Sequence, residues 1–189
     1  QERIAASADG LIFVKTHAAM ARHLGTPTIN FAVTAGAVYI VRDPRGTAVS
    51  FAAHMGRSID QAIEAMGMEG YKAPNGPTAV YELYGSWSQN VRSWTASGHK
   101  AIHVVRYEDL LADPQTSFAK IVSHLAISAT EGQISEAIEL SSFKRLQQAE
   151  KATSFREKPK ESSQFFRSGQ AGRGCDELSR AQNARLLRD

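Results

Sequence analysis

The amino-acid sequence predicts an α/β fold in which helices flank a mainly parallel sheet. Three continuous apolar runs, Leu11–Val14, Ala37–Val41 and Ala101–Val105, have the pattern of strands that are buried on both faces. Each run ends in charged or polar residues, and a parallel sheet displays its chemistry at the carboxyl ends of its strands. Segments with helical periodicity separate the second run from the third and follow the third, so strands and helices alternate along the chain.

The helices follow from periodicity and from their start signals. The stretch from Val80 to Ala96 has apolar residues at three- and four-residue spacings, and Asp113 is a good N-cap before a proline at the first helical position. The proline-containing stretch 71–77 predicts a loop, and 147–174 is polar, basic and glycine-containing with little periodicity. The predicted helices are Gly46–Met55, Ile59–Met66, Val80–Ala96, Pro114–Leu125 and Glu131–Leu140.

Length and composition favour one domain, 1–189, of an ordinary globular kind. The chain has 189 residues and a formal net charge of +3, which gives no electrostatic case for nucleic acid and suits a small polyanionic ligand. A single cysteine excludes an internal disulfide, and no apolar run is long enough to span a bilayer. We therefore expect a cytoplasmic setting without a membrane partner; the oligomeric state is not readable.

The first candidate site is Lys15-Thr16-His17, at the end of the first apolar run. Residues two apart in an extended segment point to the same face, so Lys15 and His17 can serve one site. A lysine ammonium stabilises charge on a transferring group, and a histidine can take a proton from a hydroxyl. The alternative is a solvated lysine beside an ordinary surface histidine.

The second candidate site runs from Arg42 to Ser50, where a strand turns into a helix. The N–H groups at a helix start suit phosphate, to which Arg42 can add a bidentate contact and Ser50 a hydroxyl. The alternative is that Arg42 pairs structurally with Asp43 or Asp109.

Two further stretches carry candidate residues. In the first, Tyr107 could line a nucleotide pocket, while Glu108 and Asp109 could simply cap the following turn. In the second, Phe165–Gly174, basic residues alternate with glycines, and glycine allows a backbone to approach a ligand closely. A flexible basic loop is the alternative for this stretch.

Taken together, these stretches resemble the family of cytosolic-type sulfotransferases, which use 3'-phosphoadenosine 5'-phosphosulfate (PAPS). The resemblance rests on VKTH, YIVRDPRGTAVS, VVRYEDLLADPQTSFAKIVSHL, ELSSFKRLQ and FFRSGQAG, which occur in the family's order over nearly the whole chain. It implies a sulfotransferase fold of the P-loop-NTPase-like class. It also implies transfer of a sulfuryl group from PAPS to the hydroxyl, or amine, of a small-molecule acceptor, without a metal. Adenosine 3',5'-bisphosphate would be the other product.

The resemblance also assigns roles to individual residues. His17 would be the general base and Lys15 would lie near the sulfuryl group. The stretch 147–174 would close over the nucleotide. The residues implied to hold the 3'-phosphate are Arg42, Ser50, Arg167, Ser168 and Gly169, and those around the adenine are Tyr107, Ser141 and Phe143.

Three departures from the family pattern matter. Ser168 stands where a lysine is common, and Arg173-Gly174-Cys175 stands where many members have tryptophan and a basic residue. The family's phosphosulfate-binding loop should precede VKTH, and none of the residues before Lys15 matches it. We therefore expect the carboxy-terminal majority of a sulfotransferase, truncated at its amino end and catalytically silent in isolation.

The alternative function is a non-catalytic module that binds adenosine 3',5'-bisphosphate or a related nucleotide. A nucleotide kinase of the P-loop class is disfavoured, because the sequence has no Gly-x-x-x-x-Gly-Lys-Ser/Thr stretch. The identity of the acceptor is not readable from the sequence.

Overall fold

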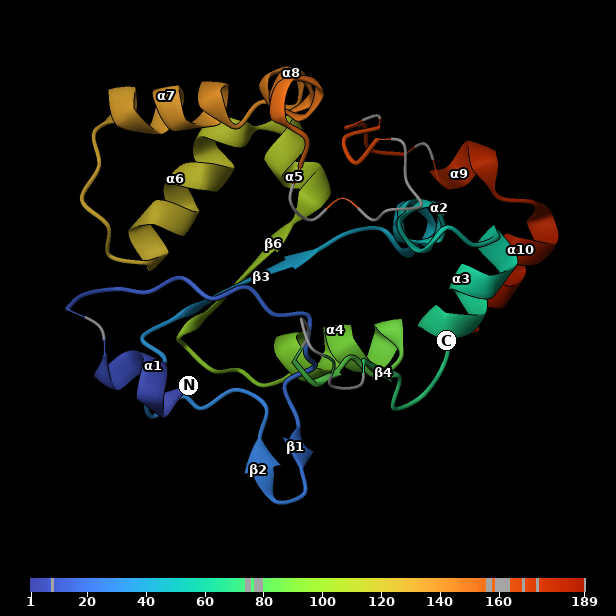
Figure 1. Cartoon of the computed structure of the whole chain (residues 1–189), viewed down its shortest axis with the longest axis horizontal. Coiled ribbons are helices and arrows are strands. Elements are labelled where there is room, and N and C mark those ends of the chain that lie inside the picture. Colours follow the sequence, from blue (N-terminus) through green and yellow to red (C-terminus); the bar gives the residue numbers. More distant parts are fainter. Residues whose placement is uncertain are drawn as a thin grey trace. The chain divides into compact units, whose positions relative to one another are not determined.

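The computed structural model of the chain describes residues 1–7, 9–73, 76, 80–155, 158, 164–167, 169–172 and 174–188, with only the backbone of Cys175. The chain divides into two compact units. Unit 1 comprises Gln1–Tyr39 and Ala65–Val104, and unit 2 comprises Ile40–Glu64 and Val105–Arg188. Figure 1 labels the elements along the chain.

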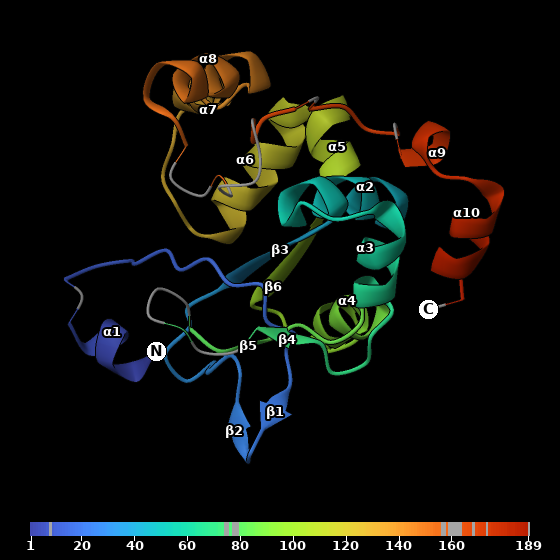
Figure 2. The same ribbon diagram turned by 45° about the vertical axis from the view of Figure 1, so that its right-hand side comes forward.

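Two of the predicted strands form a parallel pair. Strands β3 (Ala37–Val41) and β6 (Ile102–Arg106) lie side by side in both views (Figures 1 and 2). At the start of β3, the N–H of Ala37 donates at 2.8 Å to the carbonyl oxygen of Ala101, the residue that precedes β6. The α/β class with a parallel sheet flanked by helices is therefore confirmed.

The first predicted strand is wrong. Residues 11–14 have irregular backbone, and the side chains of Leu11 and Phe13 are 65% and 71% exposed. Among the described residues no strand pairs with this segment. An apolar run becomes a strand only when a neighbouring strand satisfies its backbone groups, so apolar composition alone does not fix its structure.

Short antiparallel pairs complete the strands of unit 1. Strand β1 (Arg22–His23) pairs with β2 (Thr26–Pro27) across a tight turn in which Leu24 and Gly25 both have positive φ, at 48° and 80°. Strand β4 (Lys72–Ala73) pairs with β5 (Glu82–Leu83).

Strand β5 corrects the helix predicted from Val80 to Ala96. The helix, α4 (Trp87–Thr95), begins later because the buried Ser86 closes a capping box. Its hydroxyl accepts from the N–H of Gln89, and the Gln89 side chain accepts from the N–H of Ser86. Of the apolar residues that precede Ser86, Leu83 lies in β5, whereas Val80 and Tyr84 lie in irregular backbone on either side of this strand.

Unit 1 has an aromatic centre on α4. Tyr39 and Trp94 stack with ring centroids 5.4 Å apart, and the Tyr39 hydroxyl donates to Asn90 at 2.9 Å. The Trp94 indole N–H donates to the carbonyl of Ala18 at 3.1 Å. Burial raises the pKa of Tyr39 to about 12, so the phenol is a neutral donor in this core. The short helix α1 (Glu2–Ala6) also belongs to this unit.

Unit 2 is largely helical. Helices α9 (Gly174–Glu177) and α10 (Arg180–Leu186) pack on α2 (Pro44–Met55). The helices that pack in succession are α5 (Tyr107–Ala112), α6 (Pro114–His124), α7 (Glu131–Leu140) and α8 (Phe143–Thr153). Helix α8 shows that residues 147–153 of the stretch predicted as a loop are helical. In the described part of the chain no helix combines the length and apolar character needed to cross a membrane. Helix α3 (Ile59–Met66) begins in unit 2, and its last two residues belong to unit 1.

Candidate functional site

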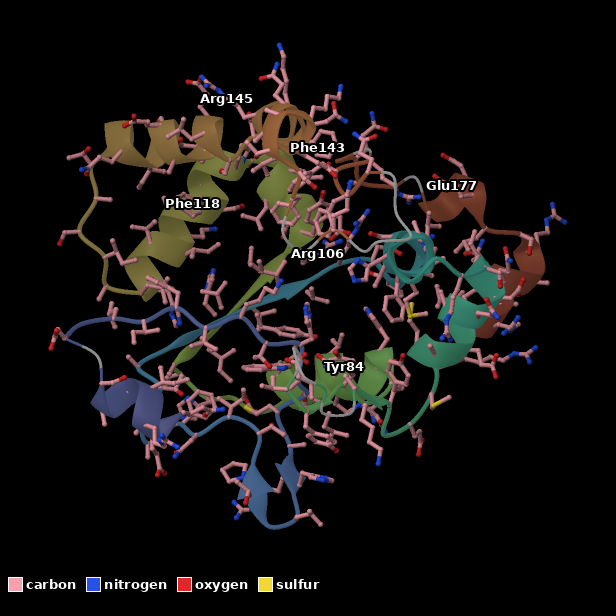
Figure 3. The ribbon with its side chains drawn as sticks, in the orientation of Figure 1. Tyr84, Arg106, Phe118, Phe143, Arg145 and Glu177 are labelled. Atoms are coloured by element: carbon pink, nitrogen blue, oxygen red, sulfur yellow. The ribbon has the colours of Figure 1, made fainter. Side chains whose placement is uncertain are left out.

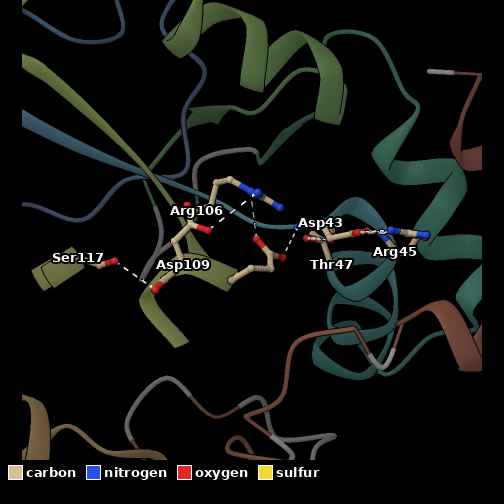
Figure 4. Close-up of polar contacts among 7 residues, drawn as sticks. Asp43, Arg45, Thr47, Arg106, Asp109 and Ser117 are labelled. Atoms are coloured by element: carbon tan, nitrogen blue, oxygen red, sulfur yellow. Dashed lines mark hydrogen bonds and ion pairs between the residues drawn. The ribbon is translucent and has the colours of Figure 1, made fainter. Parts of the chain in front are cut away.

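The turn from β3 into α2 is closed by Asp43. Its carboxylate caps the helix by accepting from the N–H of Arg45 at 2.8 Å, and it also accepts from the Arg45 guanidinium at 2.9 Å (Figure 4). The hydrogen bond from the Arg45 side chain is the main cause that holds the pKa of Asp43 below its ordinary value. The carboxylate of Asp43 therefore already occupies the N–H of Arg45 at this helix start.

The end of β6 is tied to the same turn. The N–H of Asp43 donates to the Glu108 carboxylate at 2.8 Å, and Arg106 lies 3.9 Å from Glu108 and 3.9 Å from Asp109 (Figure 4). The sequence suggested only a capping role for Glu108, whereas the structure makes it a link between the ends of two neighbouring strands. The signal in the sequence is its position shortly after the third apolar run, because the carboxyl ends of parallel strands meet at one edge of a sheet.

The Arg42 guanidinium lies over the Tyr107 ring, with its central carbon 4.6 Å from the ring centroid. Gly46 leaves the room for it, because a Cβ at that position would lie 3.1 Å from the Arg42 Nε. The sequence alternative for Arg42 is wrong, since Asp43 pairs with Arg45 and Asp109 with Arg106. Within the described residues no carboxylate pairs with Arg42, so its N–H fork is available to an anion.

The structure also brings Phe143 and Gly169 together. Gly169 has a φ of +61°, and a Cβ there would lie 2.3 Å from the Phe143 ring. Ser50 and Arg167 are exposed, and the Ser141 hydroxyl donates to the carbonyl of Ala137 at 2.7 Å. Ser168 lies outside the described residues. The convergence of all these residues on one nucleotide stays a prediction.

In unit 1, Glu82 anchors residues 15–17, the His17 segment. One carboxylate oxygen of Glu82 accepts from the Thr16 hydroxyl at 2.7 Å and from the N–H of His17 at 2.8 Å. The carbonyl of His17 accepts from Asn90 at 3.1 Å. The backbone of His17 is therefore held on both sides, while its imidazole and the Lys15 side chain are exposed.

Tyr84 completes this anchor and was missed by the sequence analysis, as was Glu82. Tyr84 lies beside α4 (Figure 3), its hydroxyl donates to Glu82 at 3.2 Å, and its ring meets the His17 ring edge-on at 6.2 Å. Burial opposes ionisation of Glu82, but the hydrogen bonds from His17 and Thr16 hold its pKa below the ordinary value. Burial, with Glu82 adding to it, raises the pKa of Tyr84 to about 12.

The Glu82 carboxylate thus holds the backbone of His17, and the phenol of Tyr84 donates to that carboxylate. In the described part of the chain, no cluster of three or more His, Cys, Asp or Glu side chains could hold a metal ion.

Comparison with known proteins gives one family. A family model described as a sulfotransferase domain matches residues 2–188. No curated protein gives a significant match to the sequence.

Solved structures share the fold. A mouse sulfotransferase, SULT7A1, complexed with PAP aligns with a TM-score of 0.59 and 23% identity, over 80% of this chain and 55% of that one. A retinol dehydratase in complex with androsterone and inactive cofactor PAP aligns with a TM-score of 0.72 and 22% identity, over 98% of this chain and 54% of that one. A retinol dehydratase complexed with retinol and PAP aligns at 0.60 and 22%, over 80% and 45%. The chain thus spans about half the length of these structures.

Proposed function

Because the chain belongs to the sulfotransferase domain family, we propose that it carries the acceptor base and the 3'-phosphate site of an enzyme that moves a sulfuryl group from PAPS to a small-molecule hydroxyl. The observation that supports this most directly is Arg42, whose guanidinium lies on Tyr107 with no carboxylate partner among the described residues. An arginine held in this way offers a planar, charged fork to a phosphate. Structures with this fold have been solved with PAP, which agrees with a nucleotide ligand.

The proposed reaction is an in-line displacement at sulfur. His17 takes the proton of the acceptor hydroxyl, whose oxygen then forms a bond to sulfur. The bond between sulfur and the phosphate oxygen breaks, and adenosine 3',5'-bisphosphate leaves with the electron pair. Lys15 lowers the energy of the charge that develops on the transferring group. The step uses charged side chains of the chain, and no metal ion is part of it.

The nucleotide side of the proposal lies in unit 2. Arg42, Ser50, Arg167 and Gly169, with Ser168, would bind the 3'-phosphate. Tyr107, Ser141 and Phe143 would surround the adenine. Gly169 packs against Phe143, so a residue predicted to bind the 3'-phosphate lies next to a residue predicted to contact the adenine. This contact supports the assignment of both residues to one nucleotide site. A small hydroxyl acceptor and a cytoplasmic setting complete the proposal.

Calorimetric titration with adenosine 3',5'-bisphosphate tests the nucleotide site. We expect Arg42→Ala to weaken binding by roughly 10- to 100-fold, as for the loss of a charge-assisted hydrogen-bonded pair. Arg42→Lys should recover only part of this loss, since an ammonium cannot make the bidentate contact. Arg57→Ala is the matched control, because Arg57 is an exposed arginine of the same unit with no proposed role.

Sulfuryl transfer from PAPS to a panel of hydroxyl compounds, measured with the natural protein, tests the reaction. Turnover together with the Arg42 effect supports the full proposal. Binding of the bisphosphate without turnover on any acceptor would favour the non-catalytic nucleotide-binding module. Equal affinity of Arg42→Ala and the unaltered chain would remove Arg42 from the site.

A further inference from the structure

Helix α8 presents three side chains in one stripe to the segment 164–169. Phe143, Gln147 and Glu150 follow at spacings of four and three residues, which places them on the same face of the helix. Each of the three contacts the segment, although no pattern in the sequence connects them to it. Phe143, the first residue of the stripe, is labelled in Figure 3.

Glu150 and Gln147 hold the peptide groups on both sides of Phe166. The N–H groups of Phe165 and Phe166 donate to the two oxygens of the Glu150 carboxylate at 2.6 and 3.0 Å. The carbonyl of Phe166 accepts from Gln147 at 3.0 Å and from Gln164 at 2.8 Å. The backbone at Phe166, just before Arg167, is therefore held by three side chains, those of Gln147, Glu150 and Gln164.

The other end of the segment is fixed by shape. Gly169 packs on the Phe143 ring so closely that no Cβ fits between them, and its φ of +61° is one that other residues rarely adopt. Arg167 is exposed and lies between the two anchors in the sequence. The side chains of the stripe thus hold the backbone on both sides of the exposed Arg167.

The burial of Glu150 shows that this attachment is a specific one. The residue is only 8% exposed. The rings of its two hydrogen-bond partners, Phe165 and Phe166, cluster with that of Phe155, with ring centroids 4.6 to 5.1 Å apart. A buried carboxylate costs free energy unless hydrogen bonds satisfy it. Although burial opposes ionisation, the N–H groups of Phe165 and Phe166 hold the pKa of Glu150 below its ordinary value. The positive charge of Lys158 acts in the same direction.

Apolar packing of the phenylalanines alone would cover the helix without fixing the direction of the backbone. Two N–H groups aimed at one carboxylate fix that direction. We propose that Glu150 is a positioning residue that sets Arg167 for the 3'-phosphate of the nucleotide, with Gln147 as its helper. This inference rests on the proposed function and adds residues that hold the phosphate-binding arginine without touching the ligand.

The test compares two ligands that differ only in the 3'-phosphate, adenosine 3',5'-bisphosphate and adenosine 5'-monophosphate, by calorimetry with the 189-residue chain. Glu150→Gln keeps the size of the side chain but places an N–H₂ group against one of the two N–H donors. We expect it to weaken bisphosphate binding about tenfold, the effect of one good hydrogen bond, and to leave monophosphate binding unchanged. Gln147→Ala, which leaves the carboxylate in place, should reduce the preference for the bisphosphate about threefold.

Gln148→Ala is the matched control, because Gln148 is exposed on the same helix. Its preference for the bisphosphate should equal that of the unaltered chain. An unchanged preference in both Glu150→Gln and Gln147→Ala overturns this inference and leaves the proposed function standing. Equal weakening of both ligands also overturns it, since that result means general damage to the fold. If the unaltered chain shows no preference for the 3'-phosphate, the proposed 3'-phosphate site fails and this inference fails with it.

Discussion

The His17 segment (residues 15–17) and the Arg167 segment (residues 164–167 and 169) are both held in place by a carboxylate, but through different contacts. Each puts a polar, exposed side chain on irregular backbone, and each is tied to a carboxylate from a distant part of the chain. Glu82 is half-buried and accepts from the Thr16 hydroxyl and the N–H of His17, at the end of an exposed apolar run, and from the Tyr84 hydroxyl. Glu150 is buried, binds two N–H groups, and works beside an aromatic cluster and a close glycine contact.

The difference indicates how each segment will respond to change. Hydrogen bonds that are partly open to water contribute about 1 kcal/mol each, because water replaces them when they are lost. A segment held by close packing has no such substitute, and added atoms must displace their neighbours. We therefore expect the His17 segment to tolerate changes around the reactive group, and the Arg167 segment to tolerate few.

The largest expected effect is chemical. His17→Ala should lower the turnover of the natural protein by roughly a hundredfold to ten-thousandfold, the usual contribution of a general base. Its affinity for adenosine 3',5'-bisphosphate should stay nearly unchanged, since the base contacts the acceptor. Steady-state kinetics and calorimetry measure the two quantities. His99→Ala, which changes another exposed histidine of unit 1, should leave both unchanged, and normal turnover of His17→Ala would remove His17 from the role.

A pair of glycine variants tests whether close packing restricts the Arg167 segment. Gly169 and Gly172 have φ values of +61° and +83°, but only a Cβ at Gly169 would meet a neighbour within 4 Å. We expect Gly172→Ala to reduce the free energy of unfolding by about 1 kcal/mol, for the left-handed backbone alone. Gly169→Ala should reduce it by about 3 kcal/mol, because overpacking against Phe143 adds to that cost. Denaturation in urea, followed by circular dichroism, gives both values, and equal losses would mean that the Phe143 contact is not restrictive.

Acid should weaken the anchor of the His17 segment. Since hydrogen bonds lower the pKa of Glu82 in the folded chain, the unfolded chain binds its proton at higher pH than the folded chain does. The stabilisation is complete above the ordinary pKa of 4.5 and is lost as the pH falls through the lower folded value. Glu82→Gln should therefore flatten the dependence of unfolding free energy on pH in this acid range.

Glu69→Gln, an exposed glutamate of the same unit, is the control and should leave the slope of the acid range unchanged. A Glu82→Gln variant with the slope of the unaltered chain would contradict the role given to these hydrogen bonds.

The smallest effect is expected for Thr16→Val. It removes the hydrogen bond that the Thr16 hydroxyl donates to Glu82 and the one that it accepts from the N–H of Ala18, and it leaves the N–H of His17 in place. We expect a loss of about 1 kcal/mol in unfolding free energy, with turnover changed less than threefold. A fall in turnover as large as that of His17→Ala would show that the His17 segment does not tolerate the loss of this hydroxyl.

Elements whose signals are local could be predicted from the amino-acid sequence. Strand β3 and helices α3 and α7 have the predicted bounds, because periodicity and capping act within a few residues. The pairing of Glu82 with His17 and of Glu150 with Phe166 spans 65 and 16 residues, and no short-range pattern encodes it.

Which apolar runs pair in a sheet, and which carboxylates hold the candidate site, depends on contacts that form only in the folded chain. A strand needs a partner for its N–H and C=O groups, and residues 11–14 have none among the described residues, whatever their composition. Arg42 lies on Tyr107 because β3 and β6 end side by side and Gly46 leaves the space. Such contacts join residues that are far apart in the sequence, so a short-range pattern of residues does not reveal them.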